Sequence, residues 1–205
     1  MKRLVSIILA ATIAASAAVA HAGETLPNTY VLPGTIPVRT QRIHGECGAY
    51  AMSSALAVLG VEVNAKTLYK AAADPVTATA WKYLDTAASS LTKRSVTRQK
   101  LIDNDAIKAA LYAGQPVIMS LPWYYSYEVT MRFNPNDVRL GRKEVRTLKT
   151  PKDDIAYFHA VIVCGWGEAG LLIQNTSGAN WGTNGRAYLP YDIVWSEAFA
   201  VYVAD

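Results

Sequence analysis

The chain is poor in cysteine and in charge for its length. Its 205 residues contain two cysteines, three histidines and a charged fraction of 18%, against an apolar fraction of 51%. Two cysteines exclude a disulfide-dense mini-protein and any metal site built only from cysteine ligands. The high apolar and low charged fractions exclude a disordered chain. A formal net charge of +4 is too small to indicate a nucleic-acid partner by itself.

Only one long apolar run is present, and it lies at the N-terminus. Lys2 and Arg3 precede the apolar run 4–20, and residues 20–22 then form the small-x-small sequence Ala-His-Ala. This pattern predicts a signal peptide over residues 1–22, and its removal leaves 183 residues with a net charge of +2. The alternative is an uncleaved membrane anchor, but a run of 17 alanine-rich residues favours cleavage. We therefore predict one exported domain, residues 23–205, that is periplasmic or secreted and has no stable membrane association after cleavage.

Helical patterns come before strand patterns along the chain. Helices are predicted at 47–59, 64–73 and 77–91, and from Asp103 or Asn104 to Gly114. Strands are predicted at 116–121, 157–165, 171–174, 186–189 and 199–203. This order indicates an α+β domain rather than an alternating βαβ fold.

Residues 122–150 combine aromatic side chains with basic ones. The aromatic residues are Trp123, Tyr124, Tyr125 and Tyr127, and the basic ones are Arg132, Arg139, Arg142, Lys143, Arg146 and Lys149. Such a mixture is found on surfaces that stack nucleic-acid bases. Because the basic residues are spread over many positions, we favour a solvated hairpin over a small aromatic core and predict no nucleic-acid partner.

Cys47 lies at the predicted start of a buried helix, directly after Gly45 and Glu46. A thiol at this point is close to the positive end of the helix dipole and to unpaired N–H groups, which favours its thiolate. A free cysteine is more often a small buried apolar residue. Position alone therefore does not identify Cys47 as a nucleophile.

His159 precedes the apolar strand segment 160–164. A histidine there can accept a thiol proton and later give it to a leaving amine. The alternative is a hydrogen-bonded core histidine. The expected mature chain has only one other histidine, His44, which lies three residues before Cys47 and is the competing candidate.

Two amide side chains complete the candidate set. Asn175 follows the predicted strand 171–174 and can accept the N–H of a histidine ring, which fixes its tautomer. Gln41, six residues before Cys47, can donate to a developing oxyanion. Each of these amides is common in loops, so the combination carries the argument.

That combination resembles the papain-like cysteine peptidases. The run Gln-Arg-Ile-His-Gly-Glu-Cys-Gly-Ala-Tyr-Ala from Gln41 is similar to their nucleophile segment. Residues 158–167, ending in Gly-Trp-Gly, resemble their histidine strand, and residues 174–185 resemble their asparagine segment. Residues 106–121 resemble the helix-then-strand unit between them. The resemblance implies a two-lobed α+β fold, with a helical lobe followed by an antiparallel β-sheet lobe and the active-site cleft between them.

The resemblance also implies an activity, that of an exported, bacterial-looking cysteine endopeptidase acting on polypeptides without a metal or cofactor. Cys47 and His159 would form a thiolate–imidazolium pair oriented by Asn175, and Gln41 would hold the oxyanion. Only residues 23–40 precede Gln41 in the expected mature chain, so no long propeptide is expected. Control is then expected from narrow specificity, an inhibitor protein or the compartment.

Three departures from the family pattern bear on this interpretation. Gly48 stands where the family has a Trp after the nucleophile, and Ser177 stands where a Trp covers the His–Asn pair. The second change predicts a wetter hydrogen bond. The family's disulfides have no counterpart here. Since His159 and Cys164 differ by five along one strand, they point to opposite faces, and we predict that Cys47 is a free thiol and Cys164 a packing residue.

Two other functions stay open. A peptidoglycan amidase or an acyltransferase would use the same nucleophile on another substrate. A catalytically inactive papain-fold binding module is kept open by Gly48 and Ser177. The chain retains all four candidate residues at the family's spacings: Gln41, Cys47, His159 and Asn175. This weighs against the inactive module, because binding alone does not require all four.

Overall fold

The computed structural model describes residues 25–43, 45–72, 81–131, 145–149, 151 and 154–205. Its helices are α2 (Cys47–Val58), α3 (Ala65–Ala72), α4 (Trp81–Thr92), α5 (Asn104–Tyr112) and α6 (Tyr125–Thr130). Its strands are β1 (Tyr30–Val31), β2 (Ser95–Leu101), β3 (Val117–Tyr124), β4 (Ile155–Gly167), β5 (Gly170–Gln174), β6 (Arg186–Leu189) and β7 (Glu197–Ala204).

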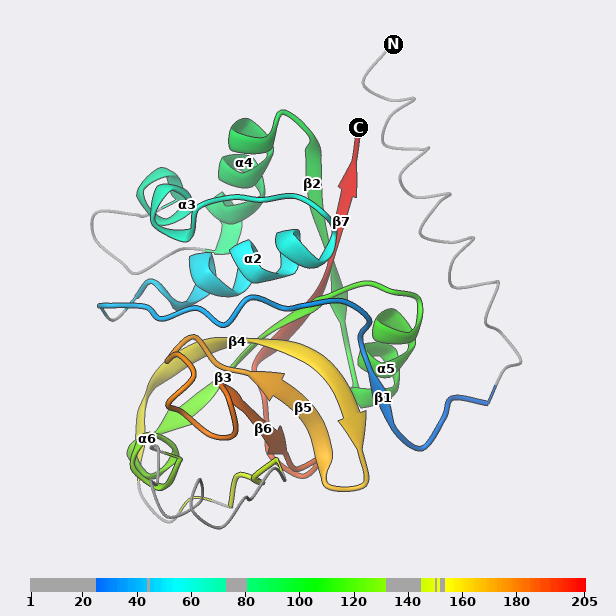
Figure 1. Ribbon diagram of the computed structural model, residues 1–205, viewed down its shortest axis with the longest axis vertical. Coiled ribbons are helices and arrows are strands. Elements are labelled where there is room, and N and C mark those ends of the chain that lie inside the picture. The colour runs from blue at the N-terminus through cyan, green and yellow to red at the C-terminus, as the bar shows by residue number, and fades with distance from the viewer. Residues whose placement is uncertain (1–24, 44, 73–80, 132–144, 150, 152–153) are drawn as a thin grey trace.

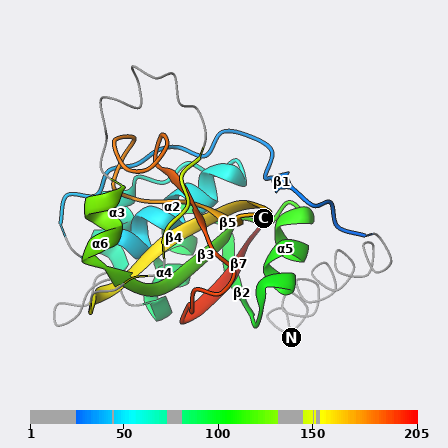
Figure 2. The same cartoon turned by 90° about the horizontal axis from the view of Figure 1, so that it is seen from below.

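The strands form one sheet in the order β2-β7-β3-β4-β5-β6, with β1 paired to β4. All pairings between these strands are antiparallel. Figure 1 shows α2, α3 and α4 gathered on one side of the sheet, with β3 to β6 curving beneath α2. Figure 2 shows α5 and α6 at opposite ends of β3, which they flank in the sequence.

The two faces of the sheet bury two separate apolar cores. Along β4, Ala160, Ile162 and Cys164 belong to the core shared with α2, α3 and α4. Val161 and Val163 belong to the core on the other face, shared with α5 and α6. Successive strand residues point to opposite faces, so β4 supplies both cores. This strand is therefore the framework on which the helical and β-sheet lobes are assembled.

Three helices begin where the sequence predicts. The Asn64 side chain accepts hydrogen bonds from the N–H groups of Lys66 and Thr67 at 3.0 and 3.1 Å and caps α3. The Asp103 side chain accepts from the Ala106 N–H at 2.7 Å and caps α5. Helix α2 begins at Cys47 and is buried over most of its length, as its nearly uniform apolar sequence predicts.

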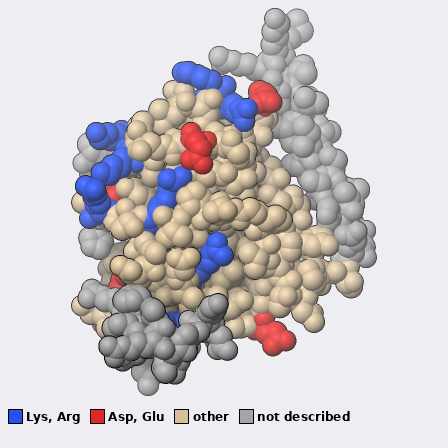
Figure 3. Space-filling view, in the orientation of Figure 1, with Lys and Arg blue, Asp and Glu red and all other residues tan. Residues whose placement is uncertain are grey.

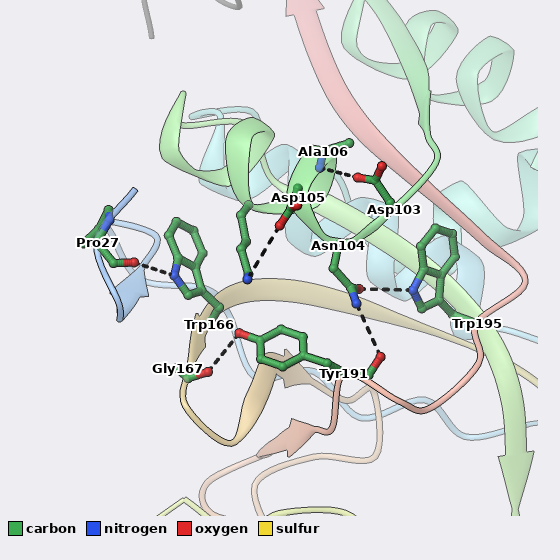
Figure 4. Close-up of polar contacts among 10 residues, drawn as sticks. Pro27, Asp103, Asn104, Asp105, Ala106, Trp166, Gly167, Tyr191 and Trp195 are labelled. Carbon is green, nitrogen blue, oxygen red and sulfur yellow. Dashed lines mark hydrogen bonds and ion pairs between the residues drawn. The ribbon is translucent and has the colours of Figure 1, made fainter. Parts of the chain in front are cut away.

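The segment before Gln41 is extended, but it is more than a surface leader. Its β1 pairs with Gly165 and Trp166 of β4, and Leu32 is only 3% exposed. A Cβ at Gly165 would collide with the backbone of Tyr30, so glycine is needed for this close approach. Figure 4 shows the Trp166 indole N–H donating to the Pro27 carbonyl at 2.9 Å. These contacts attach the segment to the β-sheet lobe.

Two elements differ from the sequence-based prediction. Strand β2 was not expected; it pairs along its whole length with β7 at the end of the chain. In residues 122–131, the structure has the end of β3 and then α6 rather than the predicted hairpin. Trp123 is fully buried in the core that the sheet shares with α5 and α6. The hairpin prediction is therefore wrong for these residues, while residues 132–144 lie outside the described part of the chain.

Basic side chains on the face seen in Figure 3 form small separate groups, with acidic ones beside some of them. Arg94 pairs with Asp205 at 3.1 Å, and Arg39 pairs with Glu62 at 3.6 Å. Four of the six basic residues singled out in 122–150 lie outside the described residues, so the absence of a nucleic-acid partner stays a prediction. In the described part of the chain, no helix has the length and apolar character needed to cross a bilayer.

Candidate active site

Cys47 is the first residue of α2 and is half-buried. The turn before it uses Gly45 at φ +92°, a left-handed conformation that favours glycine. The buried Glu46 carboxylate accepts hydrogen bonds from the backbone N–H groups of Arg42, at 2.9 Å, and Ile43, at 3.4 Å. Glu46 thus closes the loop that delivers the chain into α2, while His44 within that loop lies outside the described residues.

The sulfur of Cys47 lies against the open edge of β4. Strand β5 pairs with β4 only from Ile162 onward, so the edge beside Ala160 is left to α2. Burial raises the pKa of the Cys47 thiol, while hydrogen bonds from the backbone N–H groups of Ala160, Gly48 and Cys47 itself act to lower it. The net direction is upward. The backbone N–H groups of Cys47 and Gly48 at the start of α2 act in the direction expected of a helix terminus, but burial outweighs them, so a base is required to form the thiolate.

His159 and Asn175 meet in a buried hydrogen bond. The distance from His159 Nε2 to Asn175 Oδ1 is 2.7 Å, and the two residues are 2% and 1% exposed. Asn175 Oδ1 also accepts the backbone N–H of Thr176 at 2.7 Å, which fixes the amide with its oxygen toward the ring. In the neutral imidazole, Nε2 then carries the proton and Nδ1 is the basic nitrogen.

Trp123 covers the histidine of this pair. Its ring centroid lies 4.5 Å from that of His159, and Trp123 is fully buried. In the pairing of β3 with β4, Trp123 is opposite Tyr157 and Leu121 is opposite His159, so all four share one face of the sheet. The expectation that Ser177 makes the His–Asn bond wetter is therefore wrong, because an indole from another strand shields it.

Gln41 lies beside the asparagine segment. Its backbone N–H donates to the Thr176 carbonyl at 2.8 Å, and its Oε1 accepts from the Thr176 hydroxyl at 2.5 Å. Its Nε2 donates to the carbonyl of Ile43 at 3.2 Å. A side-chain amide nitrogen carries two hydrogens, so this bond uses one of them. The structure thus brings Gln41 to the segment that holds Asn175 and places its amide in the loop before Cys47.

Cys164 lies on the opposite face of β4 from His159, as the five-residue spacing predicts. It is fully buried, donates to the Leu172 carbonyl at 3.4 Å and has a pKa raised to about 12, chiefly by burial. Both cysteines are free thiols. In the described residues, no group of three or more His, Cys, Asp or Glu side chains is arranged to hold a metal ion.

Sequence reasoning missed three residues around His159. The sequence places Trp123 in a small aromatic core without linking it to His159, and it assigns no role to Glu128 or Tyr157. A signal for Trp123 was available, because Val117, Met119, Leu121 and Trp123 continue one apolar alternation along β3. No comparable signal marks Glu128, whose contacts depend on the packing of α6 against β3.

No family model and no curated protein matches the chain. Solved structures do match it. Xylellain, a cysteine protease from Xylella fastidiosa, aligns at 18% identity over 91% of this chain and 88% of its own, with a TM-score of 0.61. The Carica candamarcensis cysteine protease CMS1MS2, in complex with E-64, aligns at 15% identity over 87% of this chain and 99% of its own, with a TM-score of 0.59. The procathepsin L 3 of Tenebrio molitor aligns at 14% identity over 89% of this chain and 71% of its own, with a TM-score of 0.59.

At these identities the likeness shows the fold and leaves the activity to be argued from the site. The described chain has α2, α3 and α4 packed on an antiparallel sheet, most of whose strands follow these helices in the sequence. The alignments with Xylellain and with CMS1MS2 cover 91% and 87% of this chain. The predicted fold class is confirmed: the protein has a papain-like α+β fold.

Proposed function

We propose that this chain is an exported cysteine peptidase in which Cys47 is the nucleophile and His159 the base. The observation that carries the proposal is the buried His159–Asn175 hydrogen bond, which leaves Nδ1 as the basic nitrogen. The Cys47 sulfur accepts a hydrogen bond from Ala160, the neighbour of His159 in β4. A thiol whose pKa is raised by burial gains most from a base held in this way.

The proposed reaction begins with transfer of the Cys47 thiol proton to His159 Nδ1. The thiolate attacks the carbonyl carbon of a peptide bond, and the resulting oxyanion is held by the second N–H of the Gln41 amide and the backbone N–H of Cys47. His159 then gives its proton to the amide nitrogen, the C–N bond breaks and the amine leaves. Water, deprotonated by His159, hydrolyses the thioester and restores the thiol.

Export completes the proposal. The basic residues and apolar run at positions 2–20 predict a signal peptide over 1–22 and a mature domain over 23–205. Expression of the full chain with its natural N-terminus, followed by intact mass measurement, is expected to give a product that begins at Gly23 in the periplasm or medium. A full-length product retained in the membrane would contradict this part.

The activity is tested by labelling with E-64 or iodoacetamide and mapping the adduct by mass spectrometry. Rapid labelling of Cys47 that depends on His159 is expected. Cys164→Ala is the matched control, because Cys164 is fully buried and its removal should leave labelling unchanged. Slow labelling of Cys47, or equal labelling in a His159→Ala variant, would contradict the proposed pair.

Substrate class requires a separate measurement. Release of soluble peptides from casein supports the peptidase, whereas release of amines from purified cell wall supports a peptidoglycan amidase with the same nucleophile. An active thiol with neither product would point to an acyltransferase. An unreactive Cys47 in a folded protein would favour an inactive binding module.

A further inference from the structure

Glu128 accepts hydrogen bonds from three side chains that come from three different parts of the chain. Its Oε1 accepts from the Trp123 indole N–H at 3.0 Å and from the Ser177 hydroxyl at 3.4 Å. Its carboxylate also accepts from the Tyr157 hydroxyl. These donors lie on β3, after β5 and on β4, so the carboxylate on α6 joins separate elements.

Two of the three donors surround His159. The Trp123 ring lies 4.5 Å from the imidazole, between centroids, and the Tyr157 ring lies 5.9 Å away, nearly perpendicular to it. Trp123 is fully buried, and the bond to Glu128 satisfies its indole N–H. Loss of this acceptor would leave a buried donor without a partner and free the indole to shift.

Tyr157 interacts both with the Glu128 carboxylate and with Cys47. Its pKa is raised to about 12 by burial, by the charge of Glu128 and by proximity to Cys47. Tyr157 therefore remains a neutral donor throughout the physiological range. The titratable group in ring contact with His159 is Tyr157 on the same strand, and Glu128 on α6 and Cys47 on α2 both act on Tyr157.

Resting on the proposed function, we propose that Glu128 is a positioning residue that holds Trp123 and Tyr157 around His159 and whose charge favours the His159 imidazolium. A negative charge behind the two rings stabilises a positive imidazole more than a neutral one. The same carboxylate fixes the side chains that exclude water from the ring. Ser177, a departure from the family pattern, supplies the third donor to Glu128.

The direct test is the His159 titration, followed by NMR of 15N-labelled histidine. It is made in the Cys47→Ala background, so that the thiol does not titrate together with the ring. Glu128→Gln keeps an oxygen acceptor but removes the charge, and the His159 pKa is expected to fall by about half a pH unit or more. Glu168→Gln is the matched control, since Glu168 is an exposed carboxylate in the β4–β5 turn, and it should leave that pKa unchanged.

A second variant separates charge from positioning. With Cys47 present, Glu128→Leu removes charge and acceptor together, and kcat is expected to fall about tenfold or more with KM little changed. Glu128→Gln should lose less activity, and the alkaline limb of its pH profile should move to lower pH. A purely structural role would lower the melting temperature without moving that limb.

The failure of this inference can be told apart from failure of the proposed function. A His159 pKa that is equal in Cys47→Ala and in Cys47→Ala/Glu128→Gln would overturn the role of Glu128, whether or not Cys47 reacts in the wild type. A lowered pKa in a protein whose Cys47 does not react would uphold the electrostatic role of Glu128 and reject the peptidase.

Discussion

The two faces of β4 differ in what their side chains do. On one face, Ala160, Ile162 and Cys164 are small or apolar and pack against the helical lobe. On the other, His159 and Tyr157 continue the line of Val163 and Val161 toward the start of the strand. One strand therefore anchors the helix that carries Cys47 and also carries the proposed base. Packing against the helical lobe fixes β4 in place, and the fixed strand in turn holds the His159 imidazole on its other face.

The largest effect on activity is expected from replacing His159, the proposed base on the second face of β4. His159→Ala should lower kcat about 1000-fold, because the thiol loses its proton acceptor and the amine its proton donor. Burial raises the pKa of the Cys47 thiol, so in this variant labelling should be slow at neutral pH and should continue to rise above pH 9. Both quantities follow from peptide hydrolysis and labelling rates measured across pH.

Val161→Ala is the control on the same face. It removes two methyl groups from the core, and about 2 kcal/mol of unfolding free energy should be lost. Its kcat should stay within about threefold of wild type at a temperature where the variant is folded. If His159→Ala kept kcat within tenfold of wild type, His159 would have no catalytic role that Val161 lacks, and its assignment as the base would be wrong.

A smaller effect is expected at the partner of the ring. Asn175→Ala removes the acceptor that fixes the His159 tautomer, and kcat should fall about 10- to 100-fold while Cys47 still labels. Asn104→Ala is a matched control, because Asn104 also makes side-chain bonds, to Trp195 and to the Tyr191 carbonyl, but in the cluster shown in Figure 4. Asn104→Ala should lower stability without lowering kcat. Equal losses of kcat in both variants would contradict a specific role for Asn175.

The smallest effect on activity is expected on the packing face. Cys164 has a pKa raised from 9.0 to about 12. Between these values the unfolded chain releases a proton that the folded chain retains, so unfolding free energy should fall as pH rises, by about 1.4 kcal/mol per pH unit. Cys164→Ala should make this decline less steep in denaturant titrations at pH 9 to 11, and kcat at neutral pH should change less than twofold. An identical alkaline slope in both proteins would show that Cys164 is not the group responsible.

Local signals predicted the elements that depend on local chemistry. Asn64 and Asp103 cap the helices that they were expected to cap, and α2 begins at Cys47. Strand β2 was missed because it is an edge strand with only Val96 and Leu101 buried, and its pairing with β7 involves residues about a hundred positions away. The sequence places Trp123 in an aromatic cluster, but only the register of β3 against β4 decides that it lies over His159.

By itself, the sequence determined the α+β class, because capping and alternation are local properties of a chain, and its resemblance to the papain-like peptidases supplied the candidate set of Gln41, Cys47, His159 and Asn175. It also determined that His159 and Cys164 face opposite ways, since alternate strand residues point to opposite faces. Only the tertiary structure decided that a tryptophan from β3 shields the His–Asn bond, that Glu128 ties that tryptophan in place, and that burial raises the pKa of the thiol. These depend on strand register and on the environment of each group, which arise only when distant segments pack together.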